Sequence, residues 1–397
     1  MRIVHGTADD PDTATPTERS IEWARTMRAH ARADGGATVL LAHADTATSL
    51  GRPVHADRRA REDWEDATLA PGATRAEGAG ERAEAEDPDP ERTCFERDRD
   101  RIVHGTAFRR LAGKTQVFVL PEDHQRTRLT HAIEVAQVAV AIARSVGANV
   151  ALTEAIALGH DCGHGPGGHA SEDAFSPFLD GGYDHAVWGA DVVLTSLNLC
   201  TQTLDGIRNH SWSRPAPSTP EGEIVSWADR IAYVCHDFED AAHVGITSPD
   251  LLPPAVRDLG GDRRSRQLHA FIDAVVATTR ATGSVGMDAE TADALAEFRR
   301  FNYDHIYMRP ASLAQSASVI RVLRALVEFY ADRPHTLPVP LGPDRRPVTA
   351  VDDLEPGTGE ALRLAVAYVG GMTDRFAFAR AQTLLGWSSA DLPVGIG

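Results

Sequence analysis

One long apolar stripe constrains the fold of this chain more than any other feature of its sequence. Residues 127–147 read TRLTHAIEVAQVAVAIARSVG. Apolar side chains recur there at helical spacing, first at Leu129 and Ile133 and then along the whole segment. So wide a stripe is typical of a helix that is buried on most of its surface, and Gly147 suits its C-terminal cap. We therefore expect a well-buried helix that other helices surround.

The same helical period dominates the chain from about residue 93 onward, whereas alternating strand patterns are scarce. KTQVFVL at 114–120 is the best strand candidate, as half of a small hairpin. The pattern predicts a mainly α (all-α) fold with at most a small β-hairpin. Further helices are expected at 151–159, 171–179, 185–197, 221–243, 265–281, 289–302, 312–331 and 358–386.

The N-terminal segment differs in composition from the rest of the chain. Residues 1–57 are rich in Ala, Thr, Asp and Gly and contain one amphipathic stretch, at 17–33, so we expect a peripheral extension with one helix. Its heptapeptide RIVHGTA at 2–8 recurs at 101–107, and we have no physical account of the repeat. Clusters of Gly, Pro and charged residues indicate loops at 71–92, 247–262 and 333–358.

Charge and cysteine content exclude several classes of protein. The formal charge of -17 argues against attraction of nucleic acid to the whole surface, so an anionic substrate must meet a concentrated positive pocket. The four cysteines form no CxxC pair, which predicts reduced thiols. The absence of a membrane-length apolar run and of a signal-peptide pattern predicts a cytoplasmic protein. Lys114 is the one lysine among forty basic residues, either through base composition or because a compact ammonium is needed there.

Four residues form a candidate metal site. The stretch HDCGHGPGGH at 160–169 begins with His160 and Asp161, directly after the apolar segment ALTEAIALG. His131 lies in the long apolar stripe, and Asp229 lies in a segment that is apolar on nearly every side. Because an unpaired imidazole or carboxylate is costly to bury, these side chains need partners. Two imidazoles and two carboxylates predict a divalent ion of intermediate hardness.

The order of these residues resembles that of the HD-domain metal-dependent phosphohydrolases. From about residue 58 to 386, the sequence around these residues is similar to the sequences of deoxyguanosine triphosphate triphosphohydrolases and their deoxynucleotide-cleaving relatives. The resemblance implies an HD-domain catalytic core over 58–250 and a C-terminal helical region over 251–397 packed on it. The similar blocks are FERDRDRIVHGTAFRRLAGKTQVF at 95–118, RLTHAIEVAQVA at 128–139, LGHDCGHGPGGHASED at 158–173, WADRIAYVCHDFEDA at 227–241 and YVGGMTDRFA at 368–377.

The resemblance implies hydrolysis of deoxynucleoside triphosphates, with dGTP favoured, at the α-phosphate to deoxynucleoside and inorganic triphosphate. One divalent ion per subunit would take part, Mn or Mg first and Fe, Co, Ni or Zn as alternatives. Such an ion lowers the pKa of bound water and offsets charge on a phosphoryl oxygen. Its implied ligands are His131, His160, Asp161 and Asp229.

Departure of the leaving group also needs a proton donor, and the glycine-rich stretch supplies His164 and His169. Glu172 follows His169 by three residues, a helical spacing that predicts a carboxylate–histidine pair suited to general acid catalysis. His185, directly after the expected N-cap Asp184, resembles the family histidine that faces the phosphates.

The glycines among these histidines let backbone amides approach phosphate oxygens. Relatives usually carry an aromatic or other larger residue near Gly167, so the loop is expected to be looser here or the pocket wider. The residues expected to contact the nucleotide are Arg109, Lys114, Gln116, Arg128, Tyr233 and Asp237. Arg309 and Arg375 are further candidates for phosphate or for an effector.

Two other readings stay open at this point. One is an HD-type nucleotidase or guanosine tetraphosphate hydrolase. The other is a nucleotide-sensing or single-stranded nucleic-acid-binding protein with a weak catalytic site. Relatives form homo-oligomers, so a homo-oligomer with an allosteric nucleotide between subunits is expected, with weak single-stranded nucleic acid as a further partner and no membrane.

Overall fold

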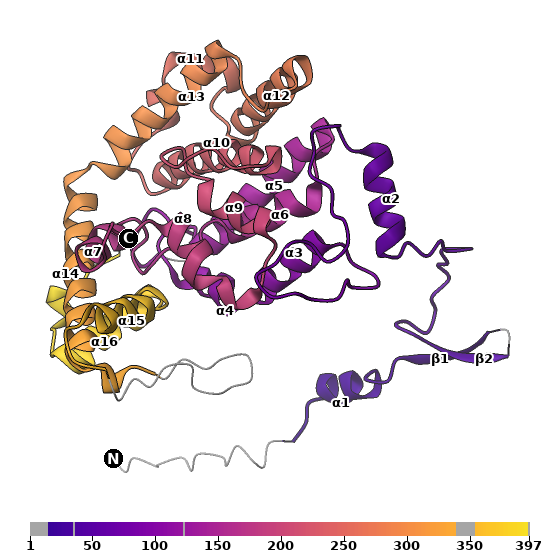
Figure 1. Cartoon of the computed structure of the whole chain (residues 1–397), viewed down its shortest axis with the longest axis horizontal. Coiled ribbons are helices and arrows are strands. Elements are labelled where there is room, and N and C mark those ends of the chain that lie inside the picture. Colours follow the sequence, from indigo (N-terminus) through magenta and orange to yellow (C-terminus); the bar gives the residue numbers. More distant parts are fainter. Residues whose placement is uncertain (1–14, 35, 122–123, 339–353, 396–397) are drawn as a thin grey trace, which may run out of the picture. The chain divides into compact units, whose positions relative to one another are not determined.

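The computed structural model describes residues 15–34, 36–121, 124–338 and 354–395. The chain divides into two compact units, Met1–His55 and Ala56–Gly397 (Figure 1). Helices dominate, and the described residues hold one two-stranded antiparallel sheet, which confirms the predicted fold class. The first copy of the RIVHGTA repeat lies outside the described residues.

The first unit contains the helix α1 (Glu18–Arg25) and the strands β1 (His30–Asp34) and β2 (Ala37–Leu41). The amphipathic stretch therefore ends as a helix at Arg25, and Ala29 takes a left-handed φ of 63° before β1 begins. The two strands pair antiparallel, with His30 opposite Leu41. GlyGly between short strands is a hairpin signal that the helical interpretation of 17–33 overlooked.

The hairpin predicted at 114–120 is wrong. The described part of this segment forms no strand, and its one β-bridge joins Thr115 to Thr127. Backbone N–H groups of the segment serve other partners, since the amide of Thr115 donates to the Asp374 carboxylate at 3.1 Å. A tertiary contact of this kind cannot be read from alternation of apolar residues.

The second unit has two hydrophobic cores. In the first, α5 (Arg128–Val146) packs against α6 (Val150–Gly159), α10 (Pro220–His243) and α12 (Arg264–Thr282), and α3 (Cys94–His104) covers α6. By length and composition α5 could cross a membrane, and it is the one such helix among the described residues. Its apolar face, including Val135, Val138 and Ile142, is fully buried against neighbouring helices.

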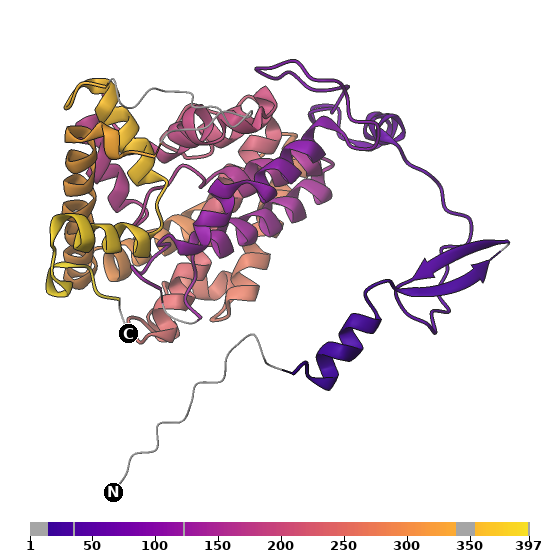
Figure 2. The same ribbon diagram turned by 90° about the horizontal axis from the view of Figure 1, so that it is seen from below.

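The second core surrounds α14 (Pro310–Asp332), which packs on α7 (Ala170–Phe175), α15 (Gly359–Gly370) and α16 (Asp374–Leu385). Figure 2 shows these C-terminal helices gathered at one end of the unit. The remaining helices are α2 (Arg58–Thr68), α4 (Thr106–Arg110), α8 (His185–Trp188), α9 (Thr201–Asn209), α11 (Pro254–Gly260) and α13 (Ala289–Asn302).

Most long helices begin and end within two residues of their predicted bounds, but three predicted helices are broken. The segment 171–179 ends as an α-helix at Phe175, and 185–197 changes after Trp188 into a π turn and a 3-10 turn. The segment 358–386 is split between α15 and α16. The predicted loop at 247–262 contains α11, and part of the predicted loop at 333–358 lies outside the described residues.

Candidate metal centre and substrate pocket

A cavity of about 550 Å³ lies in the second unit. Histidines and carboxylates line it, including His131, Asp161 and Asp229, and so do arginines and aromatic rings. A cavity of this size with a few convergent polar groups is typical of a small-molecule site.

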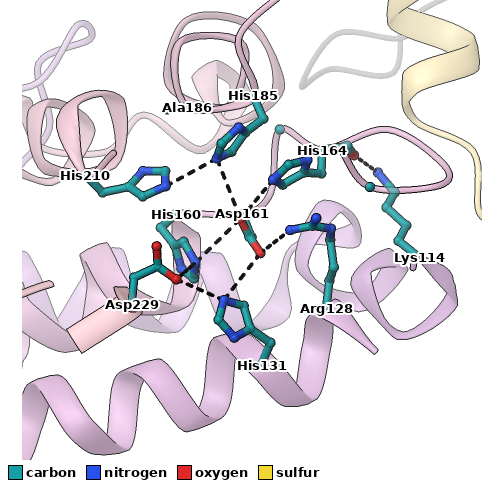
Figure 3. A network of polar contacts seen from close by, with 12 residues as sticks. Lys114, Arg128, His131, His160, Asp161, His164, His185, Ala186, His210 and Asp229 are labelled. Atoms are coloured by element: carbon teal, nitrogen blue, oxygen red, sulfur yellow. Dashed lines mark hydrogen bonds and ion pairs between the residues drawn. The ribbon is translucent and has the colours of Figure 1, made fainter. Parts of the chain in front are cut away.

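Three of the four predicted metal ligands, His131, His160 and Asp229, lie close together. They come from α5, from the residue after α6 and from α10, and their ligand atoms all lie within 4.8 Å of one another (Figure 3). His131 Nε2 is 3.1 Å from Asp229 Oδ1, and His160 Nε2 is 3.7 Å from the same oxygen. The Nδ1 of His160 contacts the carbonyl of Ala157 at 2.6 Å, and its Nε2 is buried without a hydrogen-bond partner. An imidazole held in this way presents a lone pair to the cluster, which suits a divalent ion.

Asp161, the fourth predicted ligand, stands beside this group and offers both of its oxygens. Oδ2 is 3.8 Å from His131 Nε2, and Oδ1 is 3.5 Å from His160 Nε2. Arg128, from the first turn of α5, donates to Oδ2 at 2.6 Å. The structure therefore brings all four predicted ligands together, with Asp161 next to a guanidinium group.

Both carboxylates are held in their charged form. Burial opposes ionisation of Asp161, but Arg128 and the neighbouring histidines keep its pKa well below the ordinary value. At Asp229 the hydrogen bond from His131 and the charge of His160 outweigh burial and lower the pKa. Deprotonated carboxylates at neutral pH are the form that a metal ion binds.

The glycine-rich loop that carries His164 and His169 is fixed by contacts from distant segments. Asp374, the first residue of α16, accepts a hydrogen bond from the amide of Gly167 at 2.8 Å. Gly167 has φ +73°, and an added Cβ would lie 2.3 Å from Val319 Cγ1 on α14. Val319 thus fills the space beside Gly167, where the sequence suggested a looser loop or a wider pocket.

Lys114 does not lie where we expected it. Its side chain is buried, and Nζ donates to the carbonyls of His164 and Gly370 (Figure 3). It does not line the cavity, and burial lowers its pKa to about 8. Lys114 therefore joins the glycine-rich loop to the end of α15 and does not face the substrate.

The predicted pairing of Glu172 with His169 is also absent from the hydrogen bonds of the described residues. Glu172 Oε1 instead contacts His185 Nδ1 at 2.7 Å and accepts from the His185 amide at 3.0 Å. His169 caps the N-terminus of α7, and its exposed side chain lines the cavity. The i, i+3 spacing was misleading because Glu172, in the first turn of α7, turns towards the start of α8.

The short contact between Glu172 and His185 shifts the pKa of both groups. The hydrogen bond from His185 overcomes burial and lowers the pKa of Glu172 to about 2. In return, despite burial, the pKa of His185 is raised by Glu172. The rings of His185 and His164 stack with centroids 3.7 Å apart, and His164 Nε2 is 3.2 Å from Asp161 Oδ1. Burial and Arg128 hold the pKa of His164 well below its ordinary value, so this imidazole is neutral.

His210, which sequence reasoning missed, is a further histidine of the cluster. It follows α9, is buried, and its Nε2 lies 3.3 Å from His185 Nε2. Burial, together with the nearby His160 and His185, lowers its pKa to about 3. A lone histidine in RNHSWS carries no local signal, so only the fold reveals its position.

The expected nucleotide contacts divide into two groups. Arg128, Gln116, Tyr233 and Asp237 line the cavity. Asp237 is buried and holds two neighbours, because Arg126 and the Tyr307 hydroxyl both donate to it. Arg109 is exposed on α4 and does not line the cavity, and neither do Arg309 and Arg375.

The lining of the cavity also includes residues that the sequence did not single out. The guanidinium of Arg230 lies 3.5 Å from the centre of the Trp212 ring, and Arg299 Nε donates to the Tyr233 hydroxyl at 2.8 Å. Neither arginine forms an ion pair within the described ranges. Arg230 could have been recognised from the sequence because it is adjacent to Asp229. No local pattern indicates Arg299 or Trp212.

Two protein families match the chain. The HD domain matches residues 128–234, and the phosphohydrolase-associated domain matches residues 285–383. The first match spans the segment from α5 to α10 and contains all four predicted metal ligands.

Several curated relatives are named deoxyguanosinetriphosphate triphosphohydrolase-like protein. The one from Caldanaerobacter subterraneus subsp. tengcongensis is 37% identical over 327 residues, covering 81% of this chain and 93% of that protein. A relative from Clostridium perfringens strain 13 is 38% identical, covering 65% and 80%. One from Jannaschia sp. is 33% identical, covering 77% and 92%.

Similarity to solved structures is weaker. A hypothetical protein from Aquifex aeolicus gives a TM-score of 0.41 at 17% identity, covering 71% of this chain and 70% of that chain. A phosphohydrolase from Bacteroides thetaiotaomicron gives 0.40 at 16% identity, covering 67% and 64%. The family assignment of the chain therefore rests on its sequence relatives.

Proposed function

The chain belongs to the deoxyguanosinetriphosphate triphosphohydrolase-like family of HD-domain phosphohydrolases, and from this premise we propose that it hydrolyses deoxynucleoside triphosphates at the α-phosphate. The products would be a deoxynucleoside and inorganic triphosphate. The observation that carries the proposal is one cavity that joins a histidine–carboxylate cluster to a wall with three arginines, Arg128, Arg230 and Arg299.

Arg128 and Arg230 suit a triphosphate because some of their N–H groups have no hydrogen-bond partner. Nε and Nη2 of Arg128 are buried and have no hydrogen-bond partner, although Nη1 is bound to Asp161. Nε of Arg230 is likewise buried without a partner. Because a buried N–H group without a hydrogen-bond partner is costly, such donors favour an anion in the cavity. They supply the concentrated positive field that a chain of charge -17 needs to bind one.

His131, His160, Asp161 and Asp229 would hold the divalent ion, which lowers the pKa of bound water and offsets charge on the phosphoryl group. Two imidazoles in the ligand set favour Mn, Fe, Co or Zn over Mg, which prefers oxygen ligands. Of the two ions placed first on sequence grounds, Mn is therefore the better fit.

His169 is the proposed proton donor. Its side chain faces the cavity, and its ring centre is 5.0 Å from that of His164. Desolvation lowers the pKa of His169 to about 4, and the negative charge of a bound triphosphate would raise it, so that His169 is protonated in the complex. As the bond between the α-phosphorus and the 5′-oxygen breaks, the imidazolium gives its proton to the 5′-oxygen, which leaves as the deoxynucleoside alcohol, and the proton of the attacking water goes to solvent. The oxygen of the attacking water stays on the triphosphate. His164 and His185, stacked beside Asp161, would position the α-phosphate, with Glu172 orienting His185.

Tyr233 and Asp237 would contact the sugar, with Gln116 at the sugar or base. All three line the cavity, and the hydroxyl of Tyr233 is held by Arg299. A tyrosine ring packed under the sugar would exclude a 2′-hydroxyl sterically. The preference for dGTP, the cytoplasmic location, a homo-oligomer, an allosteric nucleotide and weak binding of single-stranded nucleic acid stay predictions.

The proposal is tested with the four dNTPs, the four rNTPs and guanosine tetraphosphate, each incubated with purified protein and Mn²⁺ or Mg²⁺, and with ³¹P NMR to identify the phosphate product. We expect triphosphate from dNTPs with Mn²⁺ and little turnover of rNTPs. Release of phosphate would instead indicate a nucleotidase, and release of pyrophosphate from guanosine tetraphosphate alone would indicate the alarmone hydrolase. Absence of turnover with every nucleotide and metal would contradict the enzymatic assignment.

A further inference from the structure

Trp212 and Arg230 form a cation–π pair in the wall of the cavity. The guanidinium carbon of Arg230 lies 3.5 Å from the centre of the Trp212 ring, and both side chains line the cavity. Contact with an aromatic face occupies the flat side of a guanidinium group and leaves the N–H groups at its edge available. Nε of Arg230 is buried without a hydrogen-bond partner. The tryptophan therefore orients the arginine without taking up its donors.

The Trp212 ring is itself held in place by α10. Its Nε1 donates to the carbonyl of Ser226 at 3.1 Å, one turn before Arg230 on that helix. Its ring meets that of Trp227 edge to face, with the ring centres 4.8 Å apart. The ring is 47% exposed, so these contacts fix it and enclosure in a core does not. A side chain from the segment after α9 is thus attached to one turn of α10.

Three arginines that line the cavity are held by different kinds of partner. Arg128 donates to the Asp161 carboxylate, which offsets its charge, and Arg299 donates to a neutral tyrosine hydroxyl. Arg230 forms no ion pair among the described residues and contacts a neutral ring. A neutral partner orients an arginine and keeps its positive charge for a ligand, whereas a carboxylate would compete with a bound anion.

We propose that Trp212 is a positioning residue, which holds the guanidinium group of Arg230 towards the phosphates of a deoxynucleoside triphosphate. The inference rests on the proposed function and adds a residue that acts on the substrate through another. A free arginine side chain has many rotamers, so fixing it before the substrate arrives lowers the entropic cost of binding. Loss of the ring should therefore weaken binding of phosphates and leave the chemical step nearly unchanged.

The test is calorimetry of the full chain with tripolyphosphate, at equal Mn²⁺ in both solutions, together with dNTP kinetics. Trp212→Leu removes the ring, Trp212→Phe keeps an aromatic face, and neither can donate to Ser226. Trp212→Leu should weaken tripolyphosphate binding about tenfold, and Trp212→Phe should stay nearer to the wild type. KM for the best dNTP substrate should rise in parallel, at a kcat close to that of the wild type.

Two further variants locate the effect. In an Arg230→Ala background, Trp212→Leu should cause no additional loss of tripolyphosphate affinity, because the ring acts through that arginine. Trp387→Leu is the matched control, since Trp387 also lies over an arginine, Arg321, at 5.9 Å, but does not line the cavity. This control should bind tripolyphosphate as the wild type does.

The outcomes separate the inference from the proposed function. Equal tripolyphosphate affinities of Trp212→Leu and wild type, or equal losses in Trp212→Leu and Trp212→Phe, would overturn the inference, and dNTP hydrolysis by the wild type would then still support the function. A raised KM at unchanged tripolyphosphate affinity would also overturn it, and would assign Trp212 to the base or sugar. Binding of tripolyphosphate that depends on Trp212, in a wild type that hydrolyses no dNTP, would defeat the proposed function alone.

Tryptophan emission decides if Trp212→Leu does not fold, as judged by circular dichroism. Tripolyphosphate bound at Arg230 should change the emission of the ring beside it, so the wild type should show a change that Trp212→Phe lacks. The same change in both proteins, or none in the wild type, would overturn the inference.

Discussion

Lys114 owes its role to its burial. The ammonium group is enclosed at the base of the glycine-rich loop, where it donates to backbone carbonyls of two segments that are distant in sequence. A compact group with three donors fits such a position, whereas a planar guanidinium group does not. The rarity of lysine in this chain pointed to a position of interest, but Lys114 contacts the backbone of the loop and does not line the cavity.

Lys114→Arg should therefore lower stability and leave substrate binding largely unchanged. The larger side chain must enter filled space, which typically costs about 1–3 kcal/mol. Thermal unfolding and KM for a dNTP measure the two effects separately. Arg300→Lys, on the exposed surface of α13, is the control and should change neither. A raised KM at unchanged melting temperature would contradict this account and indicate that Lys114 contacts the substrate.

His169→Ala should retain metal and lose turnover by roughly two orders of magnitude or more, as expected for removal of a general acid. His131→Ala or Asp229→Ala should lose both metal and turnover, because each removes a proposed ligand. Metal content and kcat are measured on the same samples. Full activity of metal-bearing His169→Ala protein would remove this histidine from the mechanism.

At the scale of single residues, the sequence predicted which four side chains lie close together better than it predicted the contacts of their neighbours. A histidine or aspartate inside an apolar helix must have a partner, so His131 and Asp229 could be recognised without a structure. Glu172 could not be paired correctly, since spacing along a helix leaves open which neighbour the side chain meets. His210 and Arg299 could not be recognised as site residues, because nothing in their local sequence differs from that of ordinary surface residues.

Among the elements, the glycine-rich loop depends most on its packing against other segments. Gly167 has both a left-handed φ and no room for a side chain, because Val319 of α14 lies against it. Gly181 has a similar φ of +85°, but nothing lies within 4 Å of an added Cβ. The two positions therefore separate backbone strain from steric overlap.

Gly167→Ala should reduce the free energy of unfolding by about 1–3 kcal/mol more than Gly181→Ala, since both take on the backbone strain and only the first creates overlap. Denaturant titration of the two variants and the wild type gives the difference. Turnover should fall in Gly167→Ala, because the loop carries His164 and His169, and should persist in Gly181→Ala. Equal losses of stability would show that Val319 does not fill the space.

The polar segment at 71–92 is attached to α3 mainly by charge. Glu86 Oε2 accepts from Arg97 and Arg101, each at 2.6 Å, and its Oε1 accepts from Asn198. The hydrogen bond from Arg101 and the further contacts lower the pKa of Glu86 from 4.5 to about 2. Because the folded pKa is depressed, the stabilisation is complete above the ordinary pKa and is lost as the pH falls towards 2.

Glu86→Gln should accordingly cost about 1–2 kcal/mol near neutral pH, after allowance for solvent screening of a partly exposed group. Urea unfolding of wild type and variant between about pH 7 and pH 3 measures the gap, which should narrow on the acid side. A gap that is constant with pH would mean that the carboxylate charge does not hold the segment.

At the scale of elements, apolar stripes predicted the long helices and failed at short or polar ones. α2 and α3 were missed because charged residues dominate their sequences, although Thr93 and Glu96 form a capping box at the start of α3. The helix after His185 stops early where Gly189 packs on the backbone of Gly163, whose added Cβ would lie 2.8 Å from Gly189 Cα. Periodicity cannot detect a close backbone approach of this kind.

For the whole molecule, the site is a property of the unit Ala56–Gly397. His131 and Asp229 are 98 residues apart in sequence and in contact in the fold. Residue chemistry was enough to predict that such ligands exist and that the fold is mainly helical. The wall of the cavity, formed by side chains of α10, α13 and the segment around Trp212, could not be predicted, since it depends on how these elements are packed.

The position of bond cleavage tests the central claim most directly. Hydrolysis of a dNTP in water enriched in ¹⁸O, followed by mass spectrometry of both products, shows which atom the water attacks. Attack at the α-phosphorus predicts one ¹⁸O in inorganic triphosphate and none in the deoxynucleoside. Label in the deoxynucleoside, or a labelled phosphate or pyrophosphate in place of triphosphate, would contradict the account.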